Sequence, residues 1–168
     1  MEQYLLEEKR KLVKKQKMTR NDLIWLSQTA RDNKNSRIPY EFFDLDDTNL
    51  SGLDLSGIDF TDFQFVSANF QNANLRGTIF FDALLNAADF RNANLENADF
   101  RGRTMMSLKL GGANLHGTRF PANPDGADLN IRDLEFCNLE GAIGLPSSII
   151  EDWKKKNSFA ERIKRRFF

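Results

Sequence analysis

The sequence predicts an all-β solenoid with α-helical segments at its two ends. The first observation is an apolar residue at every fifth position from Leu45 to Phe120, sixteen positions in succession. Five is neither the period of two expected for a strand nor the period of about 3.6 expected for a helix. The second observation is that like residues recur every twenty positions, as in the series Phe60, Phe80, Phe100 and Phe120. A chain that bends at each unit and closes a turn after four units stacks these residues along one axis.

We call the apolar residue the centre of each five-residue unit. Two positions before the centre stands a small or apolar residue, with the exception of Arg103. Since an unpaired guanidinium is costly to bury, we expect the chain to bulge at Arg103 or to supply a carboxylate such as Asp82. The many Asp and Asn residues directly before the centres are expected to be turn residues that bond to nearby backbone.

The five-residue rhythm is interrupted once, after Phe120. The segment PANPDG at 121–126 has the composition of a turn. The repeat resumes with Leu129 as its next centre, followed by Leu134 and Leu139, and Leu129 lies nine residues after Phe120. We interpret the difference as four extra residues that bulge from one corner. The count is then nineteen units, or about five coils of four units.

Four units carry a more specific signature. The segments ANLRG (73–77), ADFRN (88–92), ANLEN (93–97) and ANLHG (113–117) resemble the A(D/N)LxX consensus of the pentapeptide-repeat family. The resemblance covers about 100 of the 168 residues. It implies a right-handed quadrilateral β-helix with four units per coil, in which Leu or Phe fills the axis and the small residue lies beside it.

The two ends of such a solenoid need caps, because open strand edges invite pairing with other chains. Residues 1–41 are predicted to form a helical N-terminal cap, residues 42–145 the repeat β-helix, and residues 146–168 a basic amphipathic C-terminal helix. A first helix is expected at 3–17. A capping box at 19–22 opens a second helix to about Arg31, and a linker follows at 33–39. The last helix is expected from about Ile149.

Charge divides the chain in the same way. Residues 43–145 carry a net charge of −8, whereas residues 1–42 and 146–168 carry +4 each. The N-terminus lacks the apolar segment of a signal peptide, and no apolar run approaches the length of a membrane span. These features and the single Cys137 lead us to expect a cytoplasmic location.

The sequence offers little sign of chemistry. His116 follows a centre, and one exposed histidine without ligand partners predicts neither a metal site nor a catalytic role. Cys137 occupies a small-residue slot and is expected to be an inert filler. The glycine pair at 111–112 is too weak to indicate a phosphate-binding loop. We therefore predict no enzyme activity, no catalytic residue, no metal and no cofactor.

One group of residues breaks the polar pattern expected of the outer wall. Five positions next to centres carry apolar side chains, and the twenty-residue register places them on neighbouring columns of three successive coils: Val66, Ile79, Phe81, Leu84 and Met106. A contiguous exposed apolar patch usually marks a contact surface. A separate protein partner is one occupant, a terminal helix of the same chain is a second, and a patch without any role is the third alternative.

The predicted function is that of a non-enzymatic protein-interaction module or adaptor. The resemblance implies an alternative, because some pentapeptide-repeat proteins protect DNA gyrase and look like DNA in shape and charge. The column Asp59, Ile79, Asp99, Arg119 argues against a continuous acidic surface. A second alternative is a peripheral membrane adaptor that binds through its basic C-terminal helix. That helix could also form a homodimer, and the acidic solenoid is not expected to bind nucleic acid directly.

Overall fold

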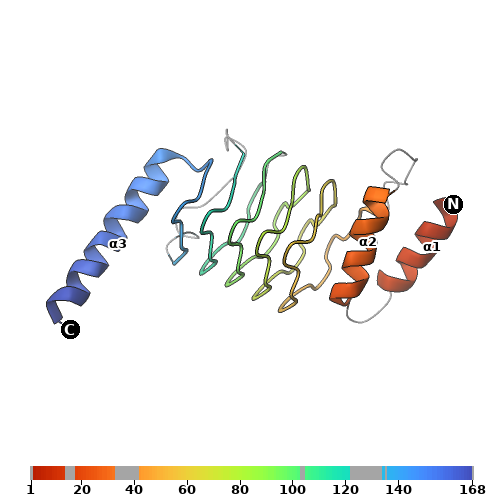
Figure 1. Cartoon of the computed structure of the whole chain (residues 1–168), viewed down its shortest axis with the longest axis horizontal. Helices are drawn as coiled ribbons and strands as arrows, with labels where there is room; N and C mark the ends of the chain where they lie inside the picture. The colour runs from red at the N-terminus through yellow and green to blue at the C-terminus, as the bar shows by residue number, and fades with distance from the viewer. Residues whose placement is uncertain are drawn as a thin grey trace.

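Three helices flank a stack of coils in the computed structural model, which describes residues 2–13, 18–32, 42–102, 105–121, 134 and 136–167. Helices α1 (Glu2–Val13) and α2 (Arg20–Asp32) lie at the N-terminal end of the stack. Helix α3 (Ser147–Phe167) lies beyond the last coil, at the opposite end (Figure 1). Among the described helices, none combines the length and the apolar character needed to cross a bilayer.

The stack is held by parallel β-bridges between residues twenty positions apart. Asn74 pairs with Asp54 on one side and with Asn94 on the other, and the same spacing recurs along the coils. The prediction of a β-solenoid is confirmed, although its β structure consists of isolated bridges, because each straight segment between turns is short. At the last coil the spacing becomes 24, since Asn114 pairs with Asn138. This register change confirms the predicted insertion of four residues.

Each unit bends at a turn that the sequence prepares. The second residue after each centre has a positive φ at all fifteen positions from 47 to 117. The amide of the next small residue closes the turn, as when Ala73 donates to the Phe70 carbonyl at 3.0 Å. This left-handed position is disfavoured for most L-residues, and Gly, Asn, Asp and Ser fill it in fourteen of the fifteen units. Ala87 is the exception.

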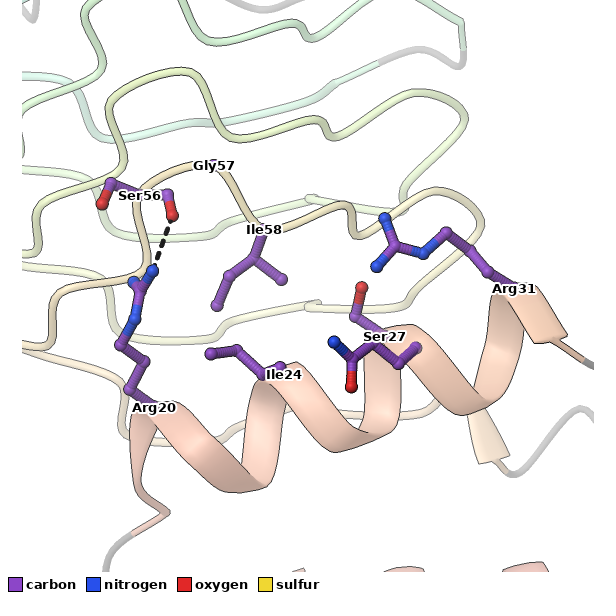
Figure 2. A pocket seen from close by; sticks show the side chains of 8 residues that line it. Arg20, Ile24, Ser27, Arg31, Ser56, Gly57 and Ile58 are labelled. Atoms are coloured by element: carbon purple, nitrogen blue, oxygen red, sulfur yellow. Dashed lines mark hydrogen bonds between the residues drawn. The ribbon is translucent and has the colours of Figure 1, made fainter.

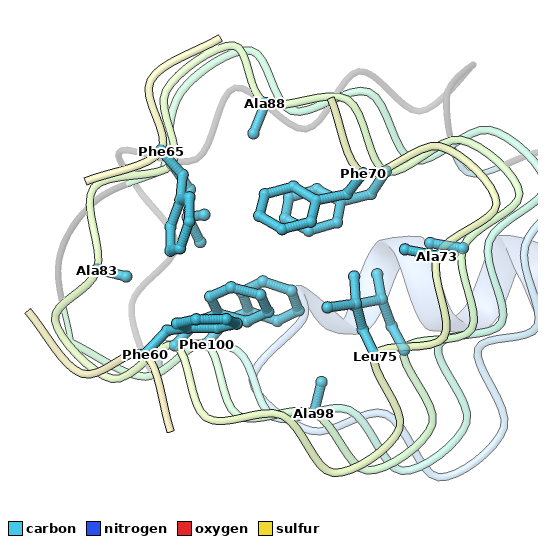
Figure 3. Packing of buried hydrophobic residues seen from close by; sticks show 14 of the residues in the cluster. Phe60, Phe65, Phe70, Ala73, Leu75, Ala83, Ala88, Ala98 and Phe100 are labelled. Carbon is cyan, nitrogen blue, oxygen red and sulfur yellow. The ribbon is translucent and has the colours of Figure 1, made fainter. Parts of the chain in front are cut away.

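The centres fill the axis as predicted. All sixteen centres from Leu45 to Phe120 are at most 2% exposed. Figure 3 shows the Phe and Leu side chains pointing inward, with Ala residues between them on the walls. The rings of Phe80 and Phe100 stack at 5.1 Å, and those of Phe100 and Phe120 at 5.7 Å. Rings on adjacent walls meet edge to face, as in the pair Phe90 and Phe100 at 5.6 Å.

The N-terminal helices close the first coil with polar side chains. Within the stack, the carbonyls of Gln64, Asn74, Arg76 and Ile79 accept hydrogen bonds from the preceding coil. Twenty residues earlier, the equivalent carbonyls meet the N-terminal helices. Lys9 donates to the Asp44 carbonyl, Arg20 to those of Asp54 (2.6 Å) and Ser56 (3.0 Å), and Ser27 to that of Asp59 (2.6 Å). These side chains thus replace the donors of a missing coil.

The predicted capping box lies at the start of α2. The Thr19 amide donates to the Asp22 carboxylate at 2.9 Å, and the Asp22 amide donates to the Thr19 hydroxyl at 3.3 Å. At the other end of the stack, the Trp153 indole of α3 donates to the Cys137 carbonyl at 2.8 Å. The first helix ends its described part at Val13, and the predicted linker at 33–39 lies outside the described residues.

Candidate interaction surface

The predicted patch lies on two adjacent walls of the solenoid. Ile79 is bridged between Asp59 and Asp99, and Leu84 is bridged to Gln64 around the next corner. Val66 and Met106 belong to the wall of Leu84, one coil before and one coil after it. The register therefore places all five predicted residues on three successive coils.

Three of the five side chains are exposed and two are half-buried. Met106 is 51% exposed, Phe81 41% and Ile79 36%. Val66 and Leu84 are half-buried. Exposed large apolar side chains cost hydrophobic free energy, so their grouping on neighbouring columns is a feature to explain.

The described contacts of the terminal helices lie at the ends of the stack. Helix α2 hydrogen-bonds to carbonyls of Asp54, Ser56 and Asp59, which belong to the first coil. The described contact of α3 through Trp153 is with Cys137 on the last coil. Phe81 and Met106 keep their exposure with all three helices in place.

A repeated hydrogen bond explains the polar pattern that the patch breaks. In eleven described units the residue before the centre is Asp or Asn, and in every one its Oδ1 accepts from the amide two residues later. Examples are the Gln71 amide on Asn69 at 3.0 Å and the Arg101 amide on Asp99 at 3.1 Å. The sequence-based interpretation of these residues as turn residues is confirmed. The full set of acceptors is Asp44, Asn49, Asp54, Asp59, Asn69, Asn74, Asp89, Asn94, Asp99, Asn114 and Asn138.

Ile79 and Leu84 occupy this acceptor position in two consecutive units. Their side chains have no oxygen to offer the amides of Phe81 and Asn86. On the wall of Leu84, a different acceptor serves two of the three turns: Asp46 accepts from the Val66 amide at 2.7 Å, and Asn86 accepts from the Met106 amide at 3.1 Å. Burial of Asp46 raises the pKa of its carboxyl, and the bond from Val66 opposes that rise.

Ion pairs lie beside the patch. Arg101, the neighbour of Phe81 one coil on, clasps Asp99 with two short bonds, Nε to Oδ1 at 2.9 Å and Nη2 to Oδ2 at 2.6 Å. These bonds from Arg101 lower the pKa of Asp99. On another wall, Arg91 clasps Asp89 in the same way. Burial of Asp89 works to raise its carboxyl pKa, but the hydrogen bonds from Arg91 and Gln71 outweigh burial and lower it.

A further wall carries a ladder of Asn amides that ends on a carboxylate. The Nδ2 group of each Asn donates to the Oδ1 of the residue one coil earlier, with distances from 3.0 to 3.4 Å. The ladder ends at the first coil on Asp54, whose carboxylate lies 3.4 Å from Arg20. Its members in chain order are Asp54, Asn74, Asn94, Asn114 and Asn138.

A small crevice separates α2 from the first coil (Figure 2). It encloses about 170 Å³ between Arg20, Ile24 and Arg31 of α2 and the turn at 56–58. Figure 2 shows the Arg20 guanidinium bonded to Ser56, so this cation serves the cap. Sequence reasoning did not find this crevice, because it arises from contacts across more than thirty residues.

On the last coil, the structure exposes two apolar side chains that sequence reasoning missed. Phe136 is 80% exposed and Ile143 60%, both on the last coil. A signal for Ile143 was present, because it stands in the column of Ile79. The other predicted positions behave as fillers or surface residues: Cys137 is 5% exposed, and His116 is half-buried. Arg103 lies outside the described residues. Within the described part, no group of three His, Cys, Asp or Glu side chains could hold a metal ion.

The repeat register agrees with a comparison against protein families. The model for pentapeptide repeats matches residues 44–82 and 83–120 with eight copies. The repeat region of this chain belongs to the pentapeptide-repeat family. The quadrilateral solenoid typical of these repeats accounts for the four walls and the twenty-residue bridges described above.

Solved structures of pentapeptide-repeat proteins are similar to part of this chain. HetL, from the cyanobacterium Nostoc sp. strain PCC 7120 and involved in heterocyst differentiation regulation, is 26% identical with a TM-score of 0.33. The match covers 60% of this chain and 38% of HetL, so the chain spans well under half of that relative. A pentapeptide repeat protein of the Arabidopsis thaliana thylakoid lumen is 25% identical, with 67% and 77% coverage and a TM-score of 0.35.

QnrB1, a plasmid-mediated fluoroquinolone resistance protein, is more distant. It is 17% identical, with 68% of this chain and 88% of QnrB1 covered and a TM-score of 0.28. No curated protein sequence matches the chain. The TM-scores of these structures are all below 0.5, so the family assignment rests on the match to the repeat model and on the twenty-residue register of the bridges.

Proposed function

We propose that this pentapeptide-repeat protein is a non-enzymatic interaction module: a solenoid of about five coils with helical ends that binds a protein partner through the patch Val66, Ile79, Phe81, Leu84 and Met106. The observation that carries this proposal is the exposure of Ile79, Phe81 and Met106 on neighbouring columns. Apolar groups at the centre of a surface patch contribute most to binding when a partner excludes water from them.

The rigidity of the solenoid supports the same function. Each wall of the patch is tied to its neighbouring coils by backbone bonds, such as Phe65 to the Leu84 carbonyl at 2.7 Å and Asp62 to the Phe81 carbonyl at 3.1 Å. The stacked Phe rings lie directly behind it. A surface that is already ordered loses little conformational entropy on binding, so its contacts translate more fully into affinity.

The test is the substitution Phe81→Asp, with Phe136→Asp as the matched control. Both residues are exposed phenylalanines, and Phe136 lies on the last coil, away from the patch. We expect Phe81→Asp to abolish partner retention in an affinity capture read by mass spectrometry, while the melting temperature stays within about 2 °C of the parent. Phe136→Asp should retain the partner. Equal retention by both variants would contradict the proposal, and a lower melting temperature for Phe81→Asp alone would assign the patch to structure.

The charge of the described surface supports gyrase protection less well than it supports the interaction module. One wall carries a ladder of Asn amides beside the Arg76–Glu96 ion pair, and the carboxylates of Asp89 and Asp99 are clasped by arginines. A DNA-like surface requires unpaired negative charge along the rod. An assay of gyrase supercoiling with and without the protein tests this alternative, and inhibition by the purified chain would favour it. The membrane-surface alternative is supported by three exposed lysines on α3, Lys154, Lys155 and Lys156. Co-sedimentation with anionic liposomes tests it.

A further inference from the structure

The turn amides of the solenoid follow a rule that fails at the patch. In thirteen described units the amide of the residue after the centre donates to a side-chain oxygen of an Asp or Asn. Eleven of these oxygens stand two residues earlier, and two stand one coil earlier. The donors are Asp46, Ser51, Ser56, Thr61, Val66, Gln71, Arg76, Arg91, Glu96, Arg101, Met106, His116 and Glu140.

Phe81 and Asn86 break the rule in consecutive units. Within the described part of the chain, no acceptor is found for the amides of Phe81, Asn86 and Gly111. The residues that would supply the oxygens are Ile79, Leu84 and Lys109. Phe81 and Asn86 therefore present backbone donors on the same two walls as the apolar patch, whereas Gly111 belongs to a unit whose preceding residue, Lys109, is bridged to Asp89.

An apolar residue in place of Asp or Asn at this position lowers the stability of the fold. A side-chain oxygen that accepts from a turn amide stabilises the folded chain, and Asp or Asn supplies it in other units, such as those of Asn69 and Asp99. A local rule that is broken twice in consecutive units, in favour of apolar side chains, is typical of a functional site. The missing oxygens and the exposed side chains are two separate observations on one surface.

We propose that the partner supplies the missing acceptors: an extended protein segment whose backbone carbonyls accept from the Phe81 and Asn86 amides while its apolar side chains pack on Ile79 and Leu84. This inference rests on the proposed function of the patch. A neutral carbonyl fits better than a carboxylate, because Asp82 lies between the two donors in the chain and the solenoid region is acidic. Ile79 and Leu84 then contribute to specificity in two ways. Their side chains offer an apolar contact, and because they have no oxygen, they leave the turn amides available to the partner.

The test compares Asn with Ala at the two positions. Ile79→Asn and Leu84→Asn remove the apolar group and install an internal acceptor in the geometry that eleven other units use. Ile79→Ala and Leu84→Ala remove the apolar group alone. Lys109→Asn is the matched control, because it installs the same acceptor for Gly111 outside the patch. The probe is a set of linear peptides that are selected from a random phage-displayed library for binding to the full chain. Only peptides whose binding is abolished by Phe81→Asp are kept.

We expect the Asn variants to bind the selected peptides about three- to tenfold more weakly than the Ala variants, with Lys109→Asn unchanged. Amide hydrogen exchange by NMR should show that peptide binding slows exchange at Phe81 and Asn86 by about tenfold or more. Thermal melting of each variant identifies any that fail to fold.

The outcomes separate the two proposals. Equal affinities for Asn and Ala variants, with no protection of the two amides, overturn the acceptor inference and leave the patch as a purely apolar contact surface. A selection that yields no peptide dependent on Phe81 overturns the proposed function and this inference together.

Discussion

The stacked-ring core predicts a specific loss of stability for Phe100→Ala. Phe100 is 1% exposed and contacts three rings: Phe80 at 5.1 Å, Phe90 at 5.6 Å and Phe120 at 5.7 Å. Truncation of a buried Phe to Ala costs about 3 to 5 kcal/mol, and each aromatic pair adds about 0.5 to 1.5 kcal/mol beyond the buried area. The range measured for truncation already contains the lost ring contacts, so with three of them lost we expect its upper end, about 5 kcal/mol.

The assay is thermal or urea unfolding followed by circular dichroism. For a chain of this length each kcal/mol lowers the melting temperature by about 2 to 4 °C, so Phe100→Ala should lower it by about 10 to 20 °C. Phe100→Leu should cost far less, because Leu fills the same slot in the neighbouring columns, as at Leu95 and Leu115. Phe136→Ala, at an 80% exposed position, is the control and should change stability by less than about 0.5 kcal/mol. Unchanged melting for both Phe100 variants would refute the stacked-column description of the core.

Three further predictions concern the cap, the ion pairs and the turn acceptors. Arg20→Ala should lower the free energy of unfolding, measured in urea, by about 1 to 2 kcal/mol, because two edge carbonyls at a partly exposed site lose their donor. Arg20→Lys should lose less, because lysine keeps one donor group. Asp99 has a lowered pKa through its bonds to Arg101, so its charged form adds stability above the ordinary carboxyl pKa; this is lost as pH falls through the lowered pKa. The stability difference between the parent and Asp99→Asn should therefore shrink in acid, and a constant difference would contradict this. Ile79→Asn and Lys109→Asn should each raise unfolding free energy by about 0.5 to 1.5 kcal/mol if the new amide takes the turn-acceptor geometry, and a loss in both would refute that role.

The repeat itself could be predicted from the sequence because its contacts are periodic. Leu or Phe at every fifth position specifies which side chains enter the axis, and the twenty-residue columns specify which coils touch. The turn role of residues such as Asn69 and Asp99 could also be predicted, because the amide that an Asp or Asn side chain binds lies just two positions later in the chain. The register change after Phe120 was likewise visible as an arithmetic break in the period.

The caps and the details of the surface were decided by tertiary structure alone. Arg20 and Ser27 reach carbonyls 32 to 36 residues away, and no periodic signal marks such pairs. The half-burial of Val66 and Leu84 depends on how adjacent walls meet at a corner. Sequence determines a solenoid through short-range repetition, whereas its ends and its contact surface follow from the three-dimensional packing of segments that share no repeat.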